Sequence, residues 1–280
     1  GHIAYMIGPR INAAGRVGSA ESAVKLFTTN DPKEAKELAL FLDEENRNRQ
    51  QLEAQILDEA LEMIEEEPRY QKEKVLVIYK EDWHHGIIGI VASKIIDKYY
   101  NPTIILSIED GIAKGSARSI SGFDLFKSLD QCKELFIKFG GHELAAGLSL
   151  NADNIEEFRK KINKIADELL QEDDLIPQIF CDDKLSLKDI NDKLIYELES
   201  LEPFGLGNIT PKFLNLKLKP NEVKSVGVDS KHLKMYVQED RIILGTIGFN
   251  LGYYRTHISS QDTIALVFSP EFNIYNGNKK

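Results

Sequence analysis

The feature that most constrains the fold is an unbroken amphipathic stretch over residues 32–66. Apolar residues recur there at steps of three and four, with the polar segment EENRNRQQ between them, a pattern typical of a helix. Asp31 is suited to cap this helix with Pro32 at its first position, and Pro68 ends it. A helix of this length spans about 50 Å. We therefore expect it to connect domains rather than to be buried in one.

A strand–helix–strand pattern follows the predicted helix. The apolar runs VLVIY, over residues 75–79, and TIILS, over 103–107, indicate short buried strands, and residues 87–99 between them indicate an amphipathic helix. This βαβ unit implies a parallel or mixed sheet. Further strands are predicted at 112–119 and 145–150, and further helices at 123–136 and 155–170. Together these segments predict one α/β domain over residues 70–172.

The pattern changes after residue 172. A short helix is predicted near 189–201, followed by the turn-rich segment PFGLGNITP. Five segments of alternating character come next: FLNLKLK, NEVKSVGV, HLKMYVQ, IILGTIGF and IALVFS. Short strands at regular spacing favour a small antiparallel barrel, with an OB fold as the leading candidate. The predicted organisation is residues 1–69, ending in the long helix, then the α/β domain, then an OB-like domain at 173–280.

Composition excludes several classes of protein. Hydrophobic residues make up 42% and charged residues 29%, which is ordinary for a globular protein. No run approaches the ~18 apolar residues of a membrane helix, and the N-terminus lacks a secretory signal, so we expect no membrane partner and a cytoplasmic location. The two cysteines, Cys132 and Cys181, belong to no CxxC or Cys/His cluster. Neither a disulfide nor a structural zinc site is therefore predicted.

The net charge of −10 argues mildly against a surface that attracts nucleic acid everywhere. Acidic residues are concentrated in helical stretches such as 58–67 and 168–174, which leaves room for a basic groove elsewhere. The chain begins without Met and ends on NGNKK. We expect it to be a piece of a longer protein.

Two segments combine arginine with glycine. GPRINAAGR carries Arg10 and Arg16, and paired guanidinium groups can hold phosphate oxygens, although a loop with two surface arginines fits equally well. KGSARSISGFDL carries Ser116 and Arg118, which share one face of a predicted strand because alternate residues do. A hydroxyl beside a guanidinium makes a compact anion site, although a solvated strand face would look the same.

FGGHELAAG is a sharper signal. Gly140 and Gly141 before His142 predict a tight turn that offers backbone N–H groups and an imidazole to a ligand. The adjacent His84 and His85 do not suggest a metal site, because no third ligand lies at a suitable spacing.

The OB-like region mixes cations with aromatic rings, as single-strand-binding barrels do. The residues in question are Lys224, Lys231, Lys234 and Arg241 together with His232, Tyr236, Phe249, Tyr253 and Tyr254. At least half of them are equally consistent with core aromatics and solvated lysines. The predicted nucleic-acid-binding set is Lys231, His232, Lys234 and Tyr236.

The ordered set of motifs resembles the RecJ exonuclease branch of the DHH phosphoesterase superfamily. The segments are GPRINAAGR, DWHHGIIGIVASK, NPTIILS, KGSARSISGFDL, FGGHELAAG, LEPFGLGNITP, SKHLKM and NIYNG, and they span almost the whole chain. The resemblance implies an α/β plus β architecture, with a DHH-associated (DHHA1) domain of mixed sheet. A long connecting helix and the end of a DHH domain would precede it, and an OB-fold-like barrel would follow.

The resemblance also implies roles for particular residues. Ser116 and Arg118 match the pair that would hold the 5′-terminal phosphate, and Arg10 or Arg16 would join them.

The glycine–histidine segment receives its role in the same way. Gly140 and Gly141 would lie against substrate phosphates, and His142 would act as a catalytic residue facing the scissile or adjacent phosphate.

The chain departs from the family because the DxD and DHH metal motifs are absent. Two-metal hydrolysis depends on carboxylates that place both ions. We therefore expect Mn²⁺ or Mg²⁺ in the intact enzyme, with ligands outside this chain, no metal here, and no activity of this chain alone. The resemblance stops at NIYNG, so the barrel is expected to lack the family's last strand.

The predicted function is a part of a single-stranded-DNA-specific 5′ to 3′ exonuclease of DNA repair and recombination. The chain would supply 5′-phosphate and single-strand binding. A phosphodiesterase acting on small or cyclic dinucleotides shares the GGH segment, and a non-catalytic single-strand-binding relative is the third alternative. Expected partners are single-stranded DNA and helicase or single-strand-binding proteins, and the expected state is a monomer.

Overall fold

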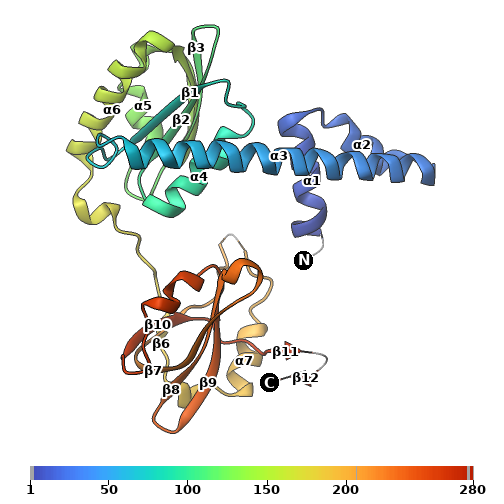
Figure 1. Cartoon of the computed structure of the whole chain (residues 1–280), viewed down its shortest axis with the longest axis vertical. Coiled ribbons are helices and arrows are strands. Elements are labelled where there is room, and N and C mark those ends of the chain that lie inside the picture. Colours follow the sequence, from blue (N-terminus) through green and yellow to red (C-terminus); the bar gives the residue numbers. More distant parts are fainter. Residues whose placement is uncertain (1–2, 206, 276–277, 280) are drawn as a thin grey trace. The chain divides into compact units, whose positions relative to one another are not determined.

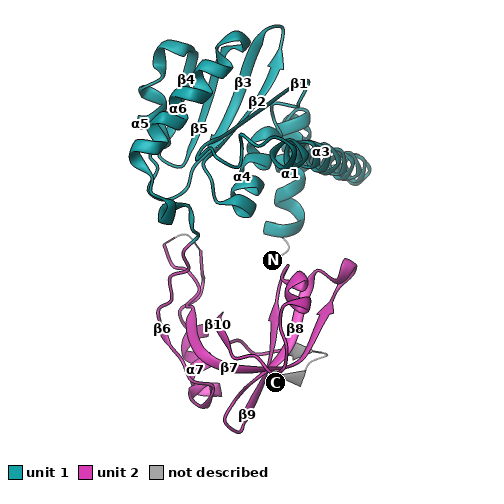
Figure 2. Ribbon diagram, turned by 60° about the vertical axis from the view of Figure 1, so that its left-hand side comes forward, with its two compact units in different colours: residues 1–177 teal, residues 178–280 magenta. Residues whose placement is uncertain are grey.

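The chain divides into two compact units, Gly1–Pro177 and Gln178–Lys280, coloured separately in Figure 2. The computed structural model describes residues 3–205, 207–275 and 278–279. Leu206 of the LEPFGLGNITP segment and Asn276 and Gly277 of NIYNG lie outside the described residues. The predicted architecture is confirmed: a long helix and a mixed α/β domain precede an OB domain.

Helices open the first unit. They are η1 (Ile3–Ile7), α1 (Gly8–Val17), α2 (Glu21–Thr28) and α3 (Pro32–Glu66), as Figure 1 shows. The predicted long helix is confirmed as α3, because the Asp31 carboxylate accepts a hydrogen bond from the backbone N–H of Lys33 at 2.9 Å and Pro32 opens the first turn. α1 and α2 pack on α3 around the buried side chains of Ala14 and Leu42. The GPRINAAGR segment is therefore helical rather than the surface loop considered above.

A five-stranded mixed sheet follows in the same unit, in the order β1-β2-β3-β5-β4. β1 and β2 are parallel, as the βαβ pattern predicts, and the other neighbours are antiparallel. The remaining elements, in chain order, are β1 (Leu76–Glu81), α4 (Ile88–Tyr99), β2 (Thr103–Glu109), β3 (Ile112–Arg118), α5 (Leu125–Asp130), η2 (Lys133–Leu135), β4 (Phe136–His142), β5 (Ala145–Asn151), η3 (Ala152–Asn154), α6 (Ile155–Leu169) and η4 (Glu172–Leu175).

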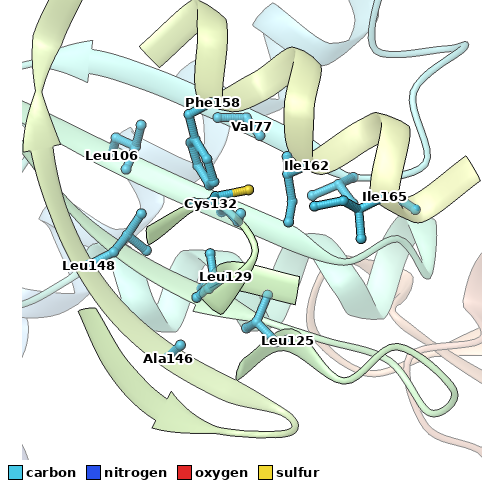
Figure 3. Close-up of a cluster of buried hydrophobic side chains, with 14 of the residues drawn as sticks. Val77, Leu106, Leu125, Leu129, Cys132, Ala146, Leu148, Phe158, Ile162 and Ile165 are labelled. Atoms are coloured by element: carbon cyan, nitrogen blue, oxygen red, sulfur yellow. The ribbon is translucent and has the colours of Figure 1, made fainter. Parts of the chain in front are cut away.

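The two faces of the sheet have different coverings. α5 and α6 cover one face, where Phe158 and Ile162 of α6 pack on strand residues such as Leu148 (Figure 3). α4 and the C-terminal half of α3 pack on the other face, against Ile78 and Ile105 of β1 and β2. The contacts of α4 with the sheet are concentrated on β2 and β3. This second face is therefore covered over β1, β2 and part of β3, and it carries exposed residues on β3, β5 and β4.

β4 corrects two predictions. The helix expected over 123–136 ends at Asp130, and the GGH segment lies in a strand instead of a turn. Phe136 and Phe139 both pack toward the α6 core although they lie three positions apart, because the strand register shifts between Phe136 and Lys138. That irregularity breaks the two-residue alternation by which strands are recognised in a sequence.

The second unit is built on strands in the order β10-β7-β8-β9, with β6 paired to β7. Its core contains Leu218, Leu233, Met235 and Val237. The elements are β6 (Asp183–Lys184), η5 (Leu187–Asp189), α7 (Asp192–Glu199), β7 (Phe213–Val226), η6 (Val228–Ser230), β8 (His232–Glu239), β9 (Ile242–Gly248), η7 (Gly252–Thr256), β10 (Ile264–Phe268), β11 (Ile274–Tyr275) and β12 (Asn278–Lys279).

β7 corrects a third prediction. FLNLKLK and NEVKSVGV, expected as separate strands, form one continuous strand. A register shift between Asn221 and Lys224 interrupts its pairing with β8, so a bulge lies next to the point where two separate strands were expected to divide. Among the described residues, no helix is long and apolar enough to cross a membrane.

The first testable prediction concerns the edge strand. Buried Asn163 of α6 accepts a hydrogen bond from the Val75 N–H at 2.9 Å and donates one to the Val75 carbonyl at 3.0 Å. Asn163→Ala leaves both backbone groups unpaired and is expected to lower the free energy of unfolding by about 2 kcal/mol or more. Urea unfolding followed through the single tryptophan, buried Trp83, measures this. Lys160→Ala on the exposed side of α6 is the matched control, and an equal loss in both variants would contradict the assignment.

Candidate nucleic-acid interface

Strand register brings the predicted site residues of β3 and β4 onto one face of the sheet. Arg118 and His142 both pair with Ala145 of the intervening strand. Ser116 and Gly140 likewise flank one residue of β5. Directly paired residues share a face, so these four form two adjacent rows on the face that α4 leaves uncovered over β5 and β4. Two strand spacings separate Arg118 from His142, or about 10 Å.

The first turn of α4 lies against Ser116 and Arg118. The Arg118 guanidinium donates to the Ser116 hydroxyl at 3.2 Å and to the Ala117 carbonyl at 2.8 Å. A Cβ atom on Gly89, in that first turn, would lie 2.7 Å from the Ser116 hydroxyl and 3.3 Å from the nearer Arg118 nitrogen. Unpaired N–H groups and the helix dipole make the N-terminus of a helix favourable for anions. Glycine at this position therefore lets the Ser116 hydroxyl and the Arg118 guanidinium lie directly against the first turn of α4.

Arg16, at the end of α1, completes the cluster. Its guanidinium donates to the Gly86 carbonyl at 3.1 Å. A Cβ atom on Gly86 would lie 2.3 Å from the Arg16 carbonyl oxygen, so only glycine permits this contact between α1 and the turn before α4. Burial, and then repulsion by Arg16, lowers the pKa of Arg118. The two guanidinium groups are therefore close enough to repel one another.

The charge of this pair is not neutralised. Within the described residues, neither Arg16 nor Arg118 forms an ion pair with a carboxylate, and their hydrogen-bond acceptors are backbone carbonyls and a hydroxyl. Arg118 is partly buried and Arg16 is exposed, and a partly buried cation without a counter-ion is costly. A phosphate dianion would supply both the missing charge and acceptors for bidentate bonds.

Arg10 is engaged elsewhere. Its guanidinium pairs with Asp43 of α3 at 2.6 Å and donates to the Met6 carbonyl. The hydrogen bond from Arg10 is the main cause of a lowered pKa of Asp43, and Arg47 adds to it. The sequence did not decide whether Arg10 or Arg16 joins Ser116 and Arg118. In the structure Arg16 lies near them, whereas Arg10 forms a contact between α1 and α3.

The double glycine combines two different requirements. A Cβ atom on Gly141 would lie 2.4 Å from the Ala145 carbonyl oxygen, so the packing of β4 on β5 requires glycine there. A Cβ atom on Gly140 would meet nothing within 4 Å, and one on Gly147 opposite would meet only the Gly115 carbonyl oxygen, at 3.9 Å. Both glycines are exposed, and neither has a side chain that projects from the sheet. We call this flat surface, formed by Gly140 and Gly147 beside the exposed His142, the floor of the open face.

Sequence reasoning gave neither Gly89 nor Gly147 a role in the site. Gly147 belongs to the floor because it pairs with Ser116 and Gly140 at once, and that relation depends on the register of three strands. The signal that was available is the alternation of Ala145, Gly147 and Ser149, which leaves one face of β5 with small side chains.

A second interface candidate lies on the OB domain. His232, Lys234 and Tyr236 alternate along β8 with buried residues of the core, so they share its outer face. Lys224 pairs with Lys234 from β7, and Gly245 lies opposite Tyr236 on β9 and leaves its ring uncovered.

The fourth predicted residue of this domain lies outside that face. Lys231 precedes β8 and forms an ion pair with Asp229 at 3.3 Å. Phe249 joins the face from the end of β9, where its exposed ring contacts His232 edge-on. Lysines beside exposed rings on a strand surface can hold the backbone and bases of a single strand.

The described residues contain no group of three or more histidine, cysteine, aspartate or glutamate side chains that could hold a metal ion. His84 and His85 stack on each other, and the His84 ring accepts a hydrogen bond from the Gly86 N–H.

Two domain families match the chain. Residues 72–168 match the DHHA1 domain and residues 181–280 match the RecJ OB domain. The chain thus contains a DHHA1 domain followed by an OB domain.

Relatives and solved structures agree with this order of domains. The single-stranded-DNA-specific exonuclease RecJ of Bacillus subtilis is 39% identical over 99% of the chain, and that of Escherichia coli is 30% identical over 99%. A crystal structure of RecJ from Thermus thermophilus in complex with Mg²⁺ superposes on 100% of the chain with a TM-score of 0.81 and 27% identity. The chain belongs to the RecJ family. It spans 35% of the B. subtilis protein, 49% of the E. coli protein and 42% of the T. thermophilus chain.

The second prediction tests the space beside α4. Gly89→Ala is expected to fold, because the atoms that its Cβ meets belong to movable side chains, but it displaces the Ser116 hydroxyl and the Arg118 guanidinium. Phosphate should raise the melting temperature of the unchanged chain, since a ligand of the folded state stabilises it. The variant should show a smaller rise. Gly15→Ala, whose Cβ meets nothing within 4 Å, should keep the full rise, and the same rise in all three chains would contradict the assignment.

Proposed function

We propose that this chain is the part of a single-stranded-DNA 5′ to 3′ exonuclease that holds the 5′-phosphate and the strand behind it. The observation that carries the proposal is the pair formed by Arg16 and Arg118, which lies beside Ser116 at the N-terminus of α4 without a carboxylate partner among the described residues. A terminal phosphate carries more charge than an internal phosphodiester. Such a site would therefore favour a phosphorylated end.

The direction of hydrolysis follows from this assignment. A strand anchored by its 5′-phosphate at Ser116 and Arg118 would present its next phosphodiester bond toward His142, about 10 Å away across two strand spacings. In this proposal the exposed imidazole contacts that phosphate, and the floor formed by Gly140 and Gly147 lets the sugar–phosphate backbone approach the sheet closely.

The metal ions of the reaction are not assigned to this chain. RecJ structures from T. thermophilus contain Mg²⁺ or Mn²⁺. The described residues offer no donor set for such an ion. We propose that ligands for the divalent metals lie in another part of the protein and that the chain alone does not hydrolyse DNA.

Selectivity for single strands would come from the second interface. The exposed ring of Tyr236, with Lys234 and Lys224 beside it, supports stacking on bases without regard to sequence. A dinucleotide phosphodiesterase would have no use for this surface, which disfavours that alternative. Helicase or single-strand-binding-protein partners, a monomeric state, a cytoplasmic location and a role in repair and recombination stay predictions.

The third prediction tests the phosphate site directly. Arg118→Ala should weaken binding of 5′-phosphorylated single strands by about 10- to 100-fold, because a charge-assisted hydrogen bond is worth about 1.5–3 kcal/mol. Binding of the same strands with a 5′-hydroxyl should change little. Fluorescence anisotropy with both oligonucleotides measures the difference, and Arg47→Ala, which removes an exposed arginine of α3, is the control. An equal loss of affinity for the 5′-phosphorylated and the 5′-hydroxyl strands would contradict the role assigned to Arg118.

The fourth prediction tests the OB surface. Tyr236→Ala should weaken binding of long single strands by about 5- to 100-fold, since stacking on an aromatic ring contributes about 1–3 kcal/mol per base. The loss should be the same for phosphorylated and unphosphorylated ends, and Tyr236→Phe, which keeps the ring, should restore affinity. If Tyr236→Phe binds as weakly as Tyr236→Ala, stacking is not the function of this residue.

A further inference from the structure

The open face of the DHHA1 sheet carries a second basic row beyond the predicted site. Lys114 of β3 and Lys138 of β4 both pair with Ser149 of β5. They lie four residues from Arg118 and His142 on the same strands, and residues at even separations share a face. The row formed by Lys114, Ser149 and Lys138 therefore lies on the same surface as the proposed phosphate site, at about 13 Å along the strands.

Nothing in the described structure neutralises this row strongly. Lys138 is exposed and has no ion pair among the described residues. Lys114 contacts Glu109 at 3.4 Å, and both side chains are more than half exposed, so the pair contributes little and is screened by salt. Ser149, between the two lysines, has a small side chain that is itself buried.

The surface between the two basic rows is suited to a strand backbone. Ser116, Gly147 and Gly140 form the row in between, and the two glycines keep it low. One row follows the next at about 7 Å along the strands. That step is close to the phosphate-to-phosphate repeat of an extended single strand. A strand that follows the sheet would therefore place one phosphate over each basic row and one over the glycine row between them, where no side chain obstructs the backbone.

We propose that Lys114 and Lys138 form a second phosphate-binding row for the single strand, about two nucleotides beyond the phosphate that faces His142. This inference rests on the proposed function of the Arg118–His142 row and adds the path of the strand. A single strand is favoured over an acidic peptide because its phosphates repeat at the spacing of the rows. Lys114 and Lys138 lie on either side of β5, and each carries a compact charge on a flexible side chain. They can therefore attract a phosphate without fixing its exact position, which suits a strand that must advance after each cleavage.

The test compares oligonucleotides of different length. Lys114→Ala/Lys138→Ala should weaken binding of a 5′-phosphorylated eight-nucleotide strand by about tenfold at low salt and should reduce the slope of log K against log salt by about 0.7–1.4, the contribution of one or two phosphate contacts. A 5′-phosphorylated dinucleotide, too short to reach the row, should bind unchanged. Lys160→Ala/Lys164→Ala is the matched control, since it removes the same charge from exposed positions of α6 on the opposite face of the sheet.

Each outcome decides the proposal. Loss of affinity for the eight-nucleotide strand alone supports it. An equal loss in both double variants, or an equal loss for both oligonucleotides, overturns the proposal and indicates a long-range charge effect. If the variant weakens binding of an acidic peptide and of neither oligonucleotide, the row binds a protein partner instead. If the unchanged chain does not distinguish a 5′-phosphate from a 5′-hydroxyl, the proposed function fails and this inference fails with it.

A further variant strengthens the row instead of weakening it. Glu109→Gln removes the carboxylate beside Lys114 without shortening the side chain. It should increase affinity for the eight-nucleotide strand by about twofold and leave the dinucleotide unaffected. Unchanged affinity for both would place Lys114 outside the path of the strand.

Discussion

The antiparallel register of β3, β5 and β4 is the constraint on which the DHHA1 surface depends. Because Ala145 pairs with both Arg118 and His142, residues from distant segments of the chain share one row of one face. A slip of one residue in either pairing would turn the side chains of that strand into the α6 core. The core opposes such a slip, since Ala117, Ala146 and Gly141 form the row between the two functional ones and fill it with small groups.

The second constraint is electrostatic. Arg16 and Arg118 repel one another, and within the part of the chain that the structure describes they are held by backbone carbonyls and close contacts at glycine rather than by carboxylates. A carboxylate partner would stabilise the free chain but would also compete with a phosphate for the same guanidinium groups. Arg10 illustrates the alternative, because its ion pair with Asp43 joins two helices and leaves it engaged.

Much of the fold follows from local patterns. The bounds of α3 agree with the prediction because capping, proline and helical periodicity all point to the same residues, and alternation alone places Ser116 beside Arg118. β4 and β7 were predicted wrongly, since each contains a register shift that breaks the two-residue period. The choice between Arg10 and Arg16 was beyond a sequence argument. It depends on Asp43 and Gly86, which lie 33 and 70 residues from their respective arginine partners.

The central claim is that this chain recognises the phosphorylated end of a single strand, and one binding measurement tests it most directly. The anisotropy of a labelled single-stranded oligonucleotide is followed as the chain is added, with a 5′-phosphate or a 5′-hydroxyl on otherwise identical strands and with a matched duplex, over a series of salt concentrations. The account predicts salt-sensitive binding that is tightest for the 5′-phosphorylated single strand. Equal affinity for the two ends across the salt series would contradict it.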